Sequence, residues 1–449
     1  MIAPLLAVLA ISHPAAAQSA PVIAPEAPAT PSRWTVSGSL RVRAETLAGQ
    51  FRPRFAEHDD VLFTRATLAV GYDAGRVRFG TELYDSRAFG QDPLSSVGTS
   101  EVNGLELVQA FADIDLGDDG DSVLRLGRMT MDVGSKRLVS RQNFRNTTNA
   151  YTGARLQTPL GGGNLTAFWV MPQYRLPDDR AGVEGHAVEW DRESTDLQFF
   201  GASWVGSLDD RATTLEIYGY GLNEQDDPAL QTRDRRLFTP GFRLRRGPGT
   251  GRVDFELEAA GQVGTARRTA AVADTRDLDV GAWFMHAEVG RTFDRVWKPR
   301  LAVQYDHASG DEGGDHYARF DPLFGARRFE FGPAGLYGPV SRQNLRSPGV
   351  RVEVRPSPRF EAMAMYRGLW LDSPTDALGL TLVADPSGRS GRFAGQQIEA
   401  RARYALRPDG AWLEVGAARL FKGRVLTDAP GAPDTGDTVY GYADVTVAF

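Results

Sequence analysis

Hydrophobic and polar residues alternate along most of the chain in segments of about ten residues, which is typical of β-strands with one apolar face. In "RVDFELEAAGQ" the apolar Val253, Phe255 and Leu257 alternate with charged residues, and "QQIEARARYA" alternates in the same way. The pattern predicts about eighteen strands. They lie near residues 34–46, 61–72, 76–86, 106–117, 122–132, 150–158, 164–172, 196–206, 212–222, 234–246, 252–263, 278–292, 299–308, 344–355, 359–370, 394–405, 411–421 and 439–449.

The connections between these strands alternate between short and long. The short ones include "DAG" at 73–75 and "GPGTG" at 247–251, whereas the long ones include 133–149, 173–195 and 309–343. Outer-membrane barrels have this arrangement, with short periplasmic turns and long extracellular loops. We therefore expect an all-β fold, a transmembrane antiparallel β-barrel of about eighteen strands that forms one domain from 34 to 449.

The last predicted strand, "VYGYADVTVAF", ends at Phe449. A barrel must pair its last strand with its first so that no edge remains in the membrane, and we expect this strand to lie beside the one that begins at Trp34. Its end at Phe449 is also the segment through which we expect the barrel-assembly machinery to act. A soluble propeller would show a repeat of about 40–50 residues, which the sequence lacks.

The composition is compatible with this prediction and excludes several alternatives. After the first dozen residues there is no apolar run of about 18 residues or more, so no transmembrane helix is predicted. Cysteine is absent, which excludes disulfides and thiolate metal sites. The net charge of -6 does not indicate a nucleic-acid partner.

The N-terminus, "MIAPLLAVLAISHPAAAQSA", has a short apolar region followed by small residues. It predicts a signal peptide over 1–17, cleaved after Ala17. Residues 18–33 are rich in proline and alanine and are expected to form a periplasmic lead-in to the barrel. The predicted location is the outer membrane of a bacterial cell, with its lipid as a partner.

Arginine dominates the polar face of the strands, since only three of the 51 basic residues are lysines. Because the apolar face meets lipid, these arginines should point into the barrel, where fixed positive charges favour the passage of anions. The alternative is that they pair with acidic residues across a wide wall. The arginines on the polar face of their strands include Arg41, Arg43, Arg65, Arg125, Arg155, Arg351, Arg401 and Arg403.

One segment, "LRLGRMTMDVGSKRLVSRQNFRNTTNAYTGARL" at 124–156, begins as a strand, breaks at Gly134 and becomes polar and basic. It is expected to fold into the barrel mouth and line a constriction; the alternative is an exposed loop. Within loop 309–343, "FEFGPAGLYG" is a candidate lid, with ordinary loop packing as its alternative.

The segment 124–156 resembles the part of the alginate-export outer-membrane channel family that reads L-R-x-G-R-Q-x-x-x-[FY]-G-x-x-R-L-V, followed by a polar stretch and F-D-G-x-R-L. Met129 replaces the usual Gln, and "YTG" replaces "FDG". Later segments, "YDHASGD" and "FDPLFGARRFEFGPAGLYGPVSRQNLRSP", are similar to the same family, so the resemblance spans 34–449.

The resemblance implies a monomeric barrel of eighteen strands through which a linear polyuronate leaves the periplasm. By matching position it makes Arg125, Arg128, Arg137, Arg145, Asn146 and Arg155 candidate pore residues. Arg128 lies on the lipid-facing parity of its strand, so it lines a pore only if a bulge at Gly127 resets the register. The complete predicted set is Arg41, Arg43, Arg65, Arg125, Arg128, Arg137, Arg145, Asn146, Arg155, Arg351, Arg401 and Arg403.

The predicted function is passive diffusion of an anionic, alginate-like polysaccharide through an arginine-lined pore. The alternative is a general or anion-preferring porin that takes up oligosaccharides or small acids. An enzyme is disfavoured because none of the six histidines lies in a G-x-S-x-G or H-E-x-x-H context. No cofactor is predicted, and "SGDEGGD" at 309–315 reads as a polar loop in preference to a cation site.

Overall fold

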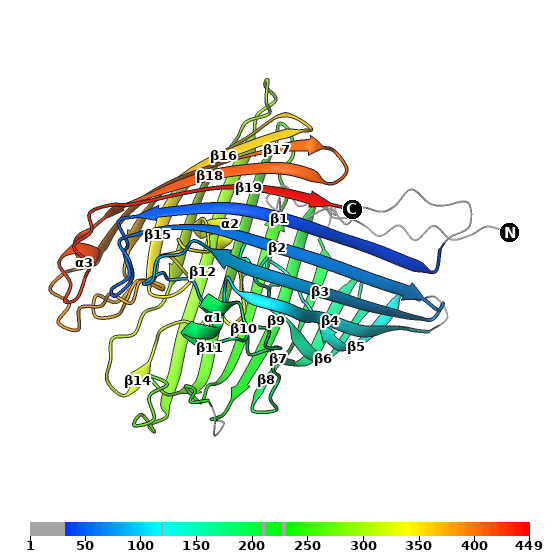
Figure 1. The fold of residues 1–449 in the computed structure, drawn as a ribbon, viewed down its shortest axis with the longest axis horizontal. Helices are drawn as coiled ribbons and strands as arrows, with labels where there is room; N and C mark the ends of the chain where they lie inside the picture. Colours follow the sequence, from blue (N-terminus) through cyan, green and yellow to red (C-terminus); the bar gives the residue numbers. More distant parts are fainter. Residues whose placement is uncertain (1–31, 118–119, 209–211, 227–229) are drawn as a thin grey trace.

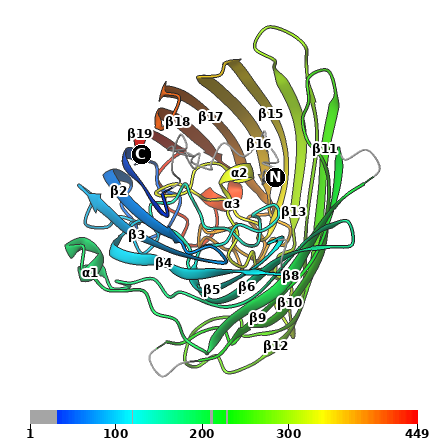
Figure 2. The ribbon, with the colours of Figure 1, turned by 90° about the vertical axis from the view of Figure 1, so that its right-hand side faces the viewer.

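The computed structural model describes residues 32–117, 120–208, 212–226 and 230–449. The predicted signal peptide and most of the predicted lead-in lie outside these residues. Eighteen antiparallel strands of the described chain form one closed wall, with β1 beside both β2 and β19 (Figures 1 and 2). The predicted barrel and its number of strands are confirmed.

The wall strands each pair with their neighbours in the sequence. β14 (His316–Tyr317) is a two-residue strand that pairs parallel with β12 and takes no part in the wall. The wall strands are β1 (Trp34–Ala48), β2 (His58–Asp73), β3 (Val77–Phe89), β4 (Asn103–Leu116), β5 (Ser122–Met129), β6 (Tyr151–Leu160), β7 (Gly163–Pro172), β8 (Leu197–Ser207), β9 (Thr213–Glu224), β10 (Arg236–Arg246), β11 (Val253–Ala266), β12 (Leu278–Thr292), β13 (Arg300–Ala308), β15 (Leu345–Ser357), β16 (Phe360–Trp370), β17 (Phe393–Arg407), β18 (Ala411–Lys422) and β19 (Thr438–Ala448).

Three short helices complete the described structure: α1 (Arg180–Gly185), α2 (Arg328–Phe331) and α3 (Arg424–Thr427). Figure 2 shows α1 outside the wall beside β3 and β4, whereas α2 lies within the barrel. None of the helices in the described ranges has the length and apolar character needed to cross a membrane.

The wall closes between β1 and β19, whose pairing runs from Ser39 opposite Ala448 to Ala48 opposite Val439. Beyond this ladder, Gly38 N–H donates to the Phe449 carbonyl and Phe449 N–H donates to the Gly38 carbonyl, both at 3.0 Å. The pairing predicted between the first and last strands is confirmed. It leaves no unpaired edge to face lipid.

Alternate residues of each strand face opposite sides of the wall, as the period of two requires. In β1 the side chains of Leu40 and Val42 are exposed by 52% and 39%, whereas Arg41 and Arg43 are exposed by only 3% and 2%. The apolar face is therefore the outer one, and the arginines point inward.

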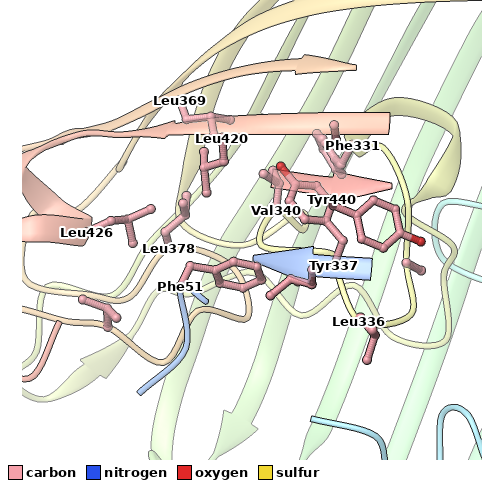
Figure 3. Close-up of a cluster of buried hydrophobic side chains, with 14 of the residues drawn as sticks. Phe51, Phe331, Leu336, Tyr337, Val340, Leu369, Leu378, Leu420, Leu426 and Tyr440 are labelled. Atoms are coloured by element: carbon pink, nitrogen blue, oxygen red, sulfur yellow. The ribbon is translucent and has the colours of Figure 1, made fainter. Parts of the chain in front are cut away.

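Two long segments that connect wall strands enter the barrel interior. The first inner segment (130–150) joins β5 to β6, and the second inner segment (309–344) joins β13 to β15 and carries α2. Both contribute to clusters of buried apolar side chains. Figure 3 shows one such cluster, in which Phe331 and Tyr337 of the second inner segment meet Phe51 and Tyr440. The interior thus has a packed apolar core of its own, and the wall does not enclose water alone.

Closure at β1 and β19 generates the first testable prediction. A Cβ atom at Gly38 would lie 2.6 Å from the Thr67 carbonyl oxygen and 2.7 Å from Cζ of the Phe449 ring. Gly38→Val should therefore displace Phe449 and reduce the free energy of unfolding by about 1–3 kcal/mol, measured by urea titration of the refolded barrel.

Gly281→Val is the matched control, because a Cβ at that strand position meets no atom within 4 Å. It should leave the urea midpoint close to that of the wild type. Equal midpoints for the two variants would show that the contact between Gly38 and Phe449 does not limit stability.

Candidate pore

The first inner segment is bound to the wall by arginines of β1 and β2. The Arg41 guanidinium donates to the carbonyls of Asn143 and Phe144, at 3.2 and 3.1 Å, and to Oδ1 of Asn146 at 2.9 Å. Arg43 donates to the Phe144 carbonyl at 2.8 Å, and Arg65 to the Asn143 carbonyl at 3.0 Å. These three predicted residues therefore meet one stretch of backbone, which they hold against the wall.

Asn146 fixes the same stretch through its side-chain amide. Its Nδ2 donates to the carbonyls of Thr64 at 3.0 Å and Glu101 at 2.8 Å, while its Oδ1 accepts from Arg41. Both ends of the amide are thus used by the protein itself. The structure brings together Asn146, which the resemblance to the family made a candidate, and Arg41, which strand parity made a candidate.

Arg137 connects the first inner segment to the opposite wall and to the second inner segment. Its guanidinium forms ion pairs with Glu256 and with Glu258 of β11, the latter at 2.5 Å, and with Glu330 of α2 at 2.8 Å. Arg342 also pairs with Glu330. All of these side chains are largely buried, so Arg137 is the common partner of three carboxylates that would otherwise repel one another.

The second inner segment also contacts β1 and β19. Arg328 Nη2 donates to the Tyr442 hydroxyl at 2.9 Å, and Leu336 N–H donates to Oε2 of Glu45 at 3.1 Å. Val139 and Phe324 form a parallel bridge between the two inner segments. The segment is therefore packed within the barrel in this conformation.

One cavity between the inner segments has a volume of about 10 Å³, enough for roughly one water molecule. It is lined by Asp132, Lys136, Ser140, Gln142, Asn143, Phe144, Ala326 and Arg328. A larger cavity of about 250 Å³ opens at the end of the short turns, and its lining includes Lys298, Arg300, Glu353, Glu361 and Arg401.

Ten of the eleven predicted arginines fall into two groups according to their partners. Six of them form ion pairs with a carboxylate, as the alternative interpretation of the sequence expected. These pairs are Arg43 with Asp444, Arg125 with Asp113, Arg128 with Glu106, Arg137 with Glu258, Arg351 with Glu288, and Arg401 with Glu414. Their charge is balanced within the protein, and a substrate would have to compete with the resident carboxylate.

Four predicted arginines have no carboxylate oxygen within 4 Å in the described part of the chain: Arg41, Arg65, Arg145 and Arg155. The side chain of Arg155 forms neither a hydrogen bond nor an ion pair with any described residue, and Arg155 lies opposite Arg125 across the β5–β6 pair. The guanidinium groups of this second group are therefore not held by a direct ion pair with a described carboxylate. Arg403 differs from both groups, since its Cζ lies 4.5 Å from the centre of the Trp412 ring.

Arg128 lies apart from the other predicted residues. Pairing between β4 and β5 continues in register across Gly127, with Ala110 opposite Arg128, so Gly127 does not reset the register. The guanidinium pairs with Glu106 at 2.6 Å and with Glu193 of the β7–β8 loop at 2.9 Å. The structure therefore does not bring Arg128 together with Arg41 and Arg65.

Further arginines without a carboxylate partner in the described ranges, three of them discussed below, were missed by reasoning on strand parity. Arg52, Arg175 and Arg327 lie on long loops, to which the period of two does not apply. Their only signal in the sequence is a basic residue within a long connection, and many arginines in such connections are paired with a carboxylate here. Arg319, for example, pairs with Asp376 at 2.5 Å.

The acidic stretch at 309–315 is also bound by basic residues. Asp311 pairs with Arg268, and Asp315 pairs with Arg276 at 2.7 Å. Within the described ranges, no three His, Cys, Asp or Glu side chains are grouped so as to hold a metal ion.

A closed wall with an apolar outer face, a charged interior and inward-folded loops defines an outer-membrane channel of the porin type. The sequence model for alginate export matches residues 33–438, and the chain belongs to the alginate export family. The outer membrane of a bacterial cell is therefore its location. No curated protein matches the sequence.

Solved structures of similar fold include proteins of Pseudomonas aeruginosa. OccK8 (OprE) has a TM-score of 0.59 at 12% identity, covering 93% of this chain and 98% of its own. OccK2 (OpdF), solved in complex with glucuronate, has a TM-score of 0.58 at 13% identity, covering 92% and 96%. OccD3 (OpdP) has a TM-score of 0.57 at 14% identity, covering 93% and 91%. At these identities the likeness concerns the fold.

The contacts of Arg137 lead to the second prediction. Arg137→Met removes the shared partner of three carboxylates, which should destabilise the packing of the inner segments by about 3–5 kcal/mol. We expect a lower urea midpoint and larger current fluctuations in single-channel recordings. Lys136→Met is the neighbouring control, because Lys136 pairs only with Asp132 at 3.0 Å and is partly exposed. If both variants gave the quiet current of the wild type, the Arg137 network would not hold the segments.

Proposed function

We propose that this protein is a passive channel for carboxylate-bearing saccharides, foremost an alginate-like polyuronate that crosses the outer membrane. Membership of the alginate export family supports the substrate class. The observation that carries the proposal is the group of interior arginines without a carboxylate partner in the described chain, represented by Arg41, Arg65, Arg145 and Arg155.

A polyuronate carries one carboxylate on each sugar, so its passage needs repeated attraction by weak sites. One tight site would hold the polymer, whereas several modest sites let it enter and leave. Arginine suits this purpose because its planar fork matches a carboxylate and is always charged. Salt-bridged arginines beside the carboxylate-free ones keep the total attraction moderate.

A sugar chain does not fit the cavity of about 10 Å³ between the inner segments, so its passage there involves separation of these segments. A sugar chain entering from the periplasm would first occupy the cavity of about 250 Å³ at the short turns. It would then have to displace contacts such as that between Arg328 and Tyr442.

The narrow space favours a second candidate, an anion-preferring porin for small acids or short oligosaccharides. Monomeric uronates would need a smaller displacement of the inner segments than a polymer does. The fold similarity to OccK2, which was solved with glucuronate, is compatible with this candidate. Neither candidate assigns the protein an enzymatic activity.

We further propose that the channel works as a monomer, because β1 and β19 close the wall within one chain. The strand that ends at Phe449 is proposed as the segment that the barrel-assembly machinery recognises. Residues 1–17 remain predicted to be a signal peptide that directs the chain to this route.

The third prediction concerns ion selectivity and block in a planar bilayer. The refolded wild type should prefer anions in a salt gradient, and polymannuronate should block its current. Arg155→Gln should weaken the block about tenfold, equivalent to about 1.4 kcal/mol, because Arg155 has no carboxylate to compete with the substrate.

Arg276→Gln removes the same charge from an exposed pair with Asp315 and should leave the block unchanged. A large conductance that polymannuronate does not alter, with little ion preference, would overturn the polyuronate proposal. Passage of glucuronate without passage of the polymer would favour the second candidate.

A further inference from the structure

The loop between β7 and β8 folds over the outer face of the wall, whereas the two inner segments enter the interior. Figures 1 and 2 show α1 of this loop outside the strands, beside β3 and β4. We call residues 177–193 of this loop the outer strap. The His186 ring lies 4.8 Å from the ring of Phe89, an exposed side chain of β3, and Nε2 of His186 lies 2.5 Å from the Ala88 carbonyl oxygen. The outer strap therefore covers part of the face that meets lipid.

Hydrogen bonds fix the outer strap to β4 and to the loop that precedes it. Near the start of the strap, Arg180 donates to the Pro93 carbonyl at 2.9 Å. Near its end, Nδ2 of Asn103 donates to Oδ1 of Asp191 at 2.9 Å, and Asp191 N–H donates to Oε2 of Glu106 at 2.8 Å. Both ends of the strap are thus bound, so its position against the wall is defined by the protein.

The outer strap also accounts for the position of Arg128. This residue lies on the lipid-facing parity of β5, where a charge exposed to hydrocarbon is costly. Its guanidinium pairs with Glu193 of the strap at 2.9 Å and donates to the Asp191 carbonyl at 3.3 Å, and little of the side chain is exposed. The strap therefore shields an outward-facing charge from lipid.

The surface that the outer strap turns away from the wall is apolar. Val188 and Trp190 are exposed by 54% and 58%. A Cβ atom at Gly104 would lie 3.6 Å from Cγ2 of Val188, and the next residue, Leu105, is also exposed. We call Phe89, Leu105, Val188 and Trp190 the rim patch. It continues the lipid-facing surface of β3 and β4 onto the strap.

The rim patch lies at the end of the wall that carries the long loops. The strap contacts Asn103 and Gly104 at the start of β4, a strand of 14 residues. A tilted strand of this length rises about 35 Å, which exceeds the apolar band of about 25 Å in outer-membrane barrels. The ends of β4 therefore reach the lipid headgroups. Tryptophan is enriched at this level, and the exposed charges of Glu189 and Arg192 beside Trp190 suit it as well.

An exposed apolar patch at this place has two candidate partners, lipid and a second copy of this chain. The rim patch is continuous with the lipid-facing wall through Phe89 and Leu105, and this continuity favours lipid. We propose that the outer strap is a lipid-contact element, which seats Val188 and Trp190 in the outer leaflet where acyl chains meet headgroups. The proposal rests on the location in the outer membrane and is independent of the substrate.

The fourth prediction tests lipid contact by spin labelling. Because the chain has no cysteine, Val188→Cys gives a single attachment site for a nitroxide. In full-length protein reconstituted into bilayers of phosphatidylcholine and phosphatidylglycerol, the label should collide mainly with oxygen, which concentrates in hydrocarbon. Its ratio of oxygen to water-soluble nickel-chelate collisions should be several-fold higher than that of a label at Val272→Cys. Val272 is an exposed valine of the β11–β12 loop and serves as the matched control.

Val303→Cys supplies the lipid reference in the same bilayers, because Val303 is an exposed valine of the wall strand β13. A label at 188 that resembles the label at 272, while the label at 303 reports lipid, would overturn the proposal. Spectral broadening at 188 that disappears on dilution with unlabelled protein would assign the rim patch to a second copy and overturn lipid contact. As a second measurement, Trp190→Phe should remove a component of the tryptophan emission that brominated phosphatidylcholine quenches.

The fifth prediction concerns the anchor of the outer strap. Arg128→Gln removes the charge that joins β5 to Glu193, so the strap should loosen, and the label at 188 should become more mobile and lose part of its oxygen preference. Arg87→Gln is the matched control, because Arg87 pairs with Asp85 of its own strand at 2.7 Å. It should leave the spectrum unchanged. If Arg128→Gln also left it unchanged, Arg128 would not be the anchor, and the hydrogen bonds of the strap would suffice to hold it.

Discussion

The structure depends on one constraint: lipid offers no hydrogen-bond partner, so every backbone N–H and C=O of the wall must be paired within the protein. The ladder between β1 and β19 meets this requirement by joining the two ends of the wall. Closure also imposes a strict alternation, because each strand has lipid on one side and the interior on the other. The outward Leu40 and the inward Arg41 are neighbours in sequence for this reason.

Closure of eighteen strands encloses more space than the wall side chains fill, and the two inner segments occupy part of it. A backbone inside the barrel brings its own polar groups, which need partners away from bulk water. Arg41, Arg43 and Arg65 supply donors to the carbonyls of the first inner segment. Interior arginine therefore has a structural use that is separate from any contact with a substrate.

The sequence was sufficient to predict the wall, because a strand with one lipid-facing side shows alternating apolar and polar residues over a short stretch of the chain. It also predicted that Arg41 and Arg43 point inward. It could not predict their partners, since the Asn143 and Phe144 carbonyls lie about a hundred residues away in the chain. The loop arginines Arg175 and Arg327 were not predicted for a related reason: irregular loops have no period that assigns a side chain to a face.

Net charge and local charge lead to opposite expectations for this protein. The chain carries -6 overall, which by itself would disfavour anions. Ion pairs such as that of Arg125 with Asp113 cancel locally and contribute little field at a distance. An entering ion meets the positive charge that is not in ion pairs. In the described interior this charge includes Arg145 and Arg155. The proposed anion preference of this net acidic channel therefore depends on where its arginines lack carboxylates, which the total of acidic and basic residues does not reveal.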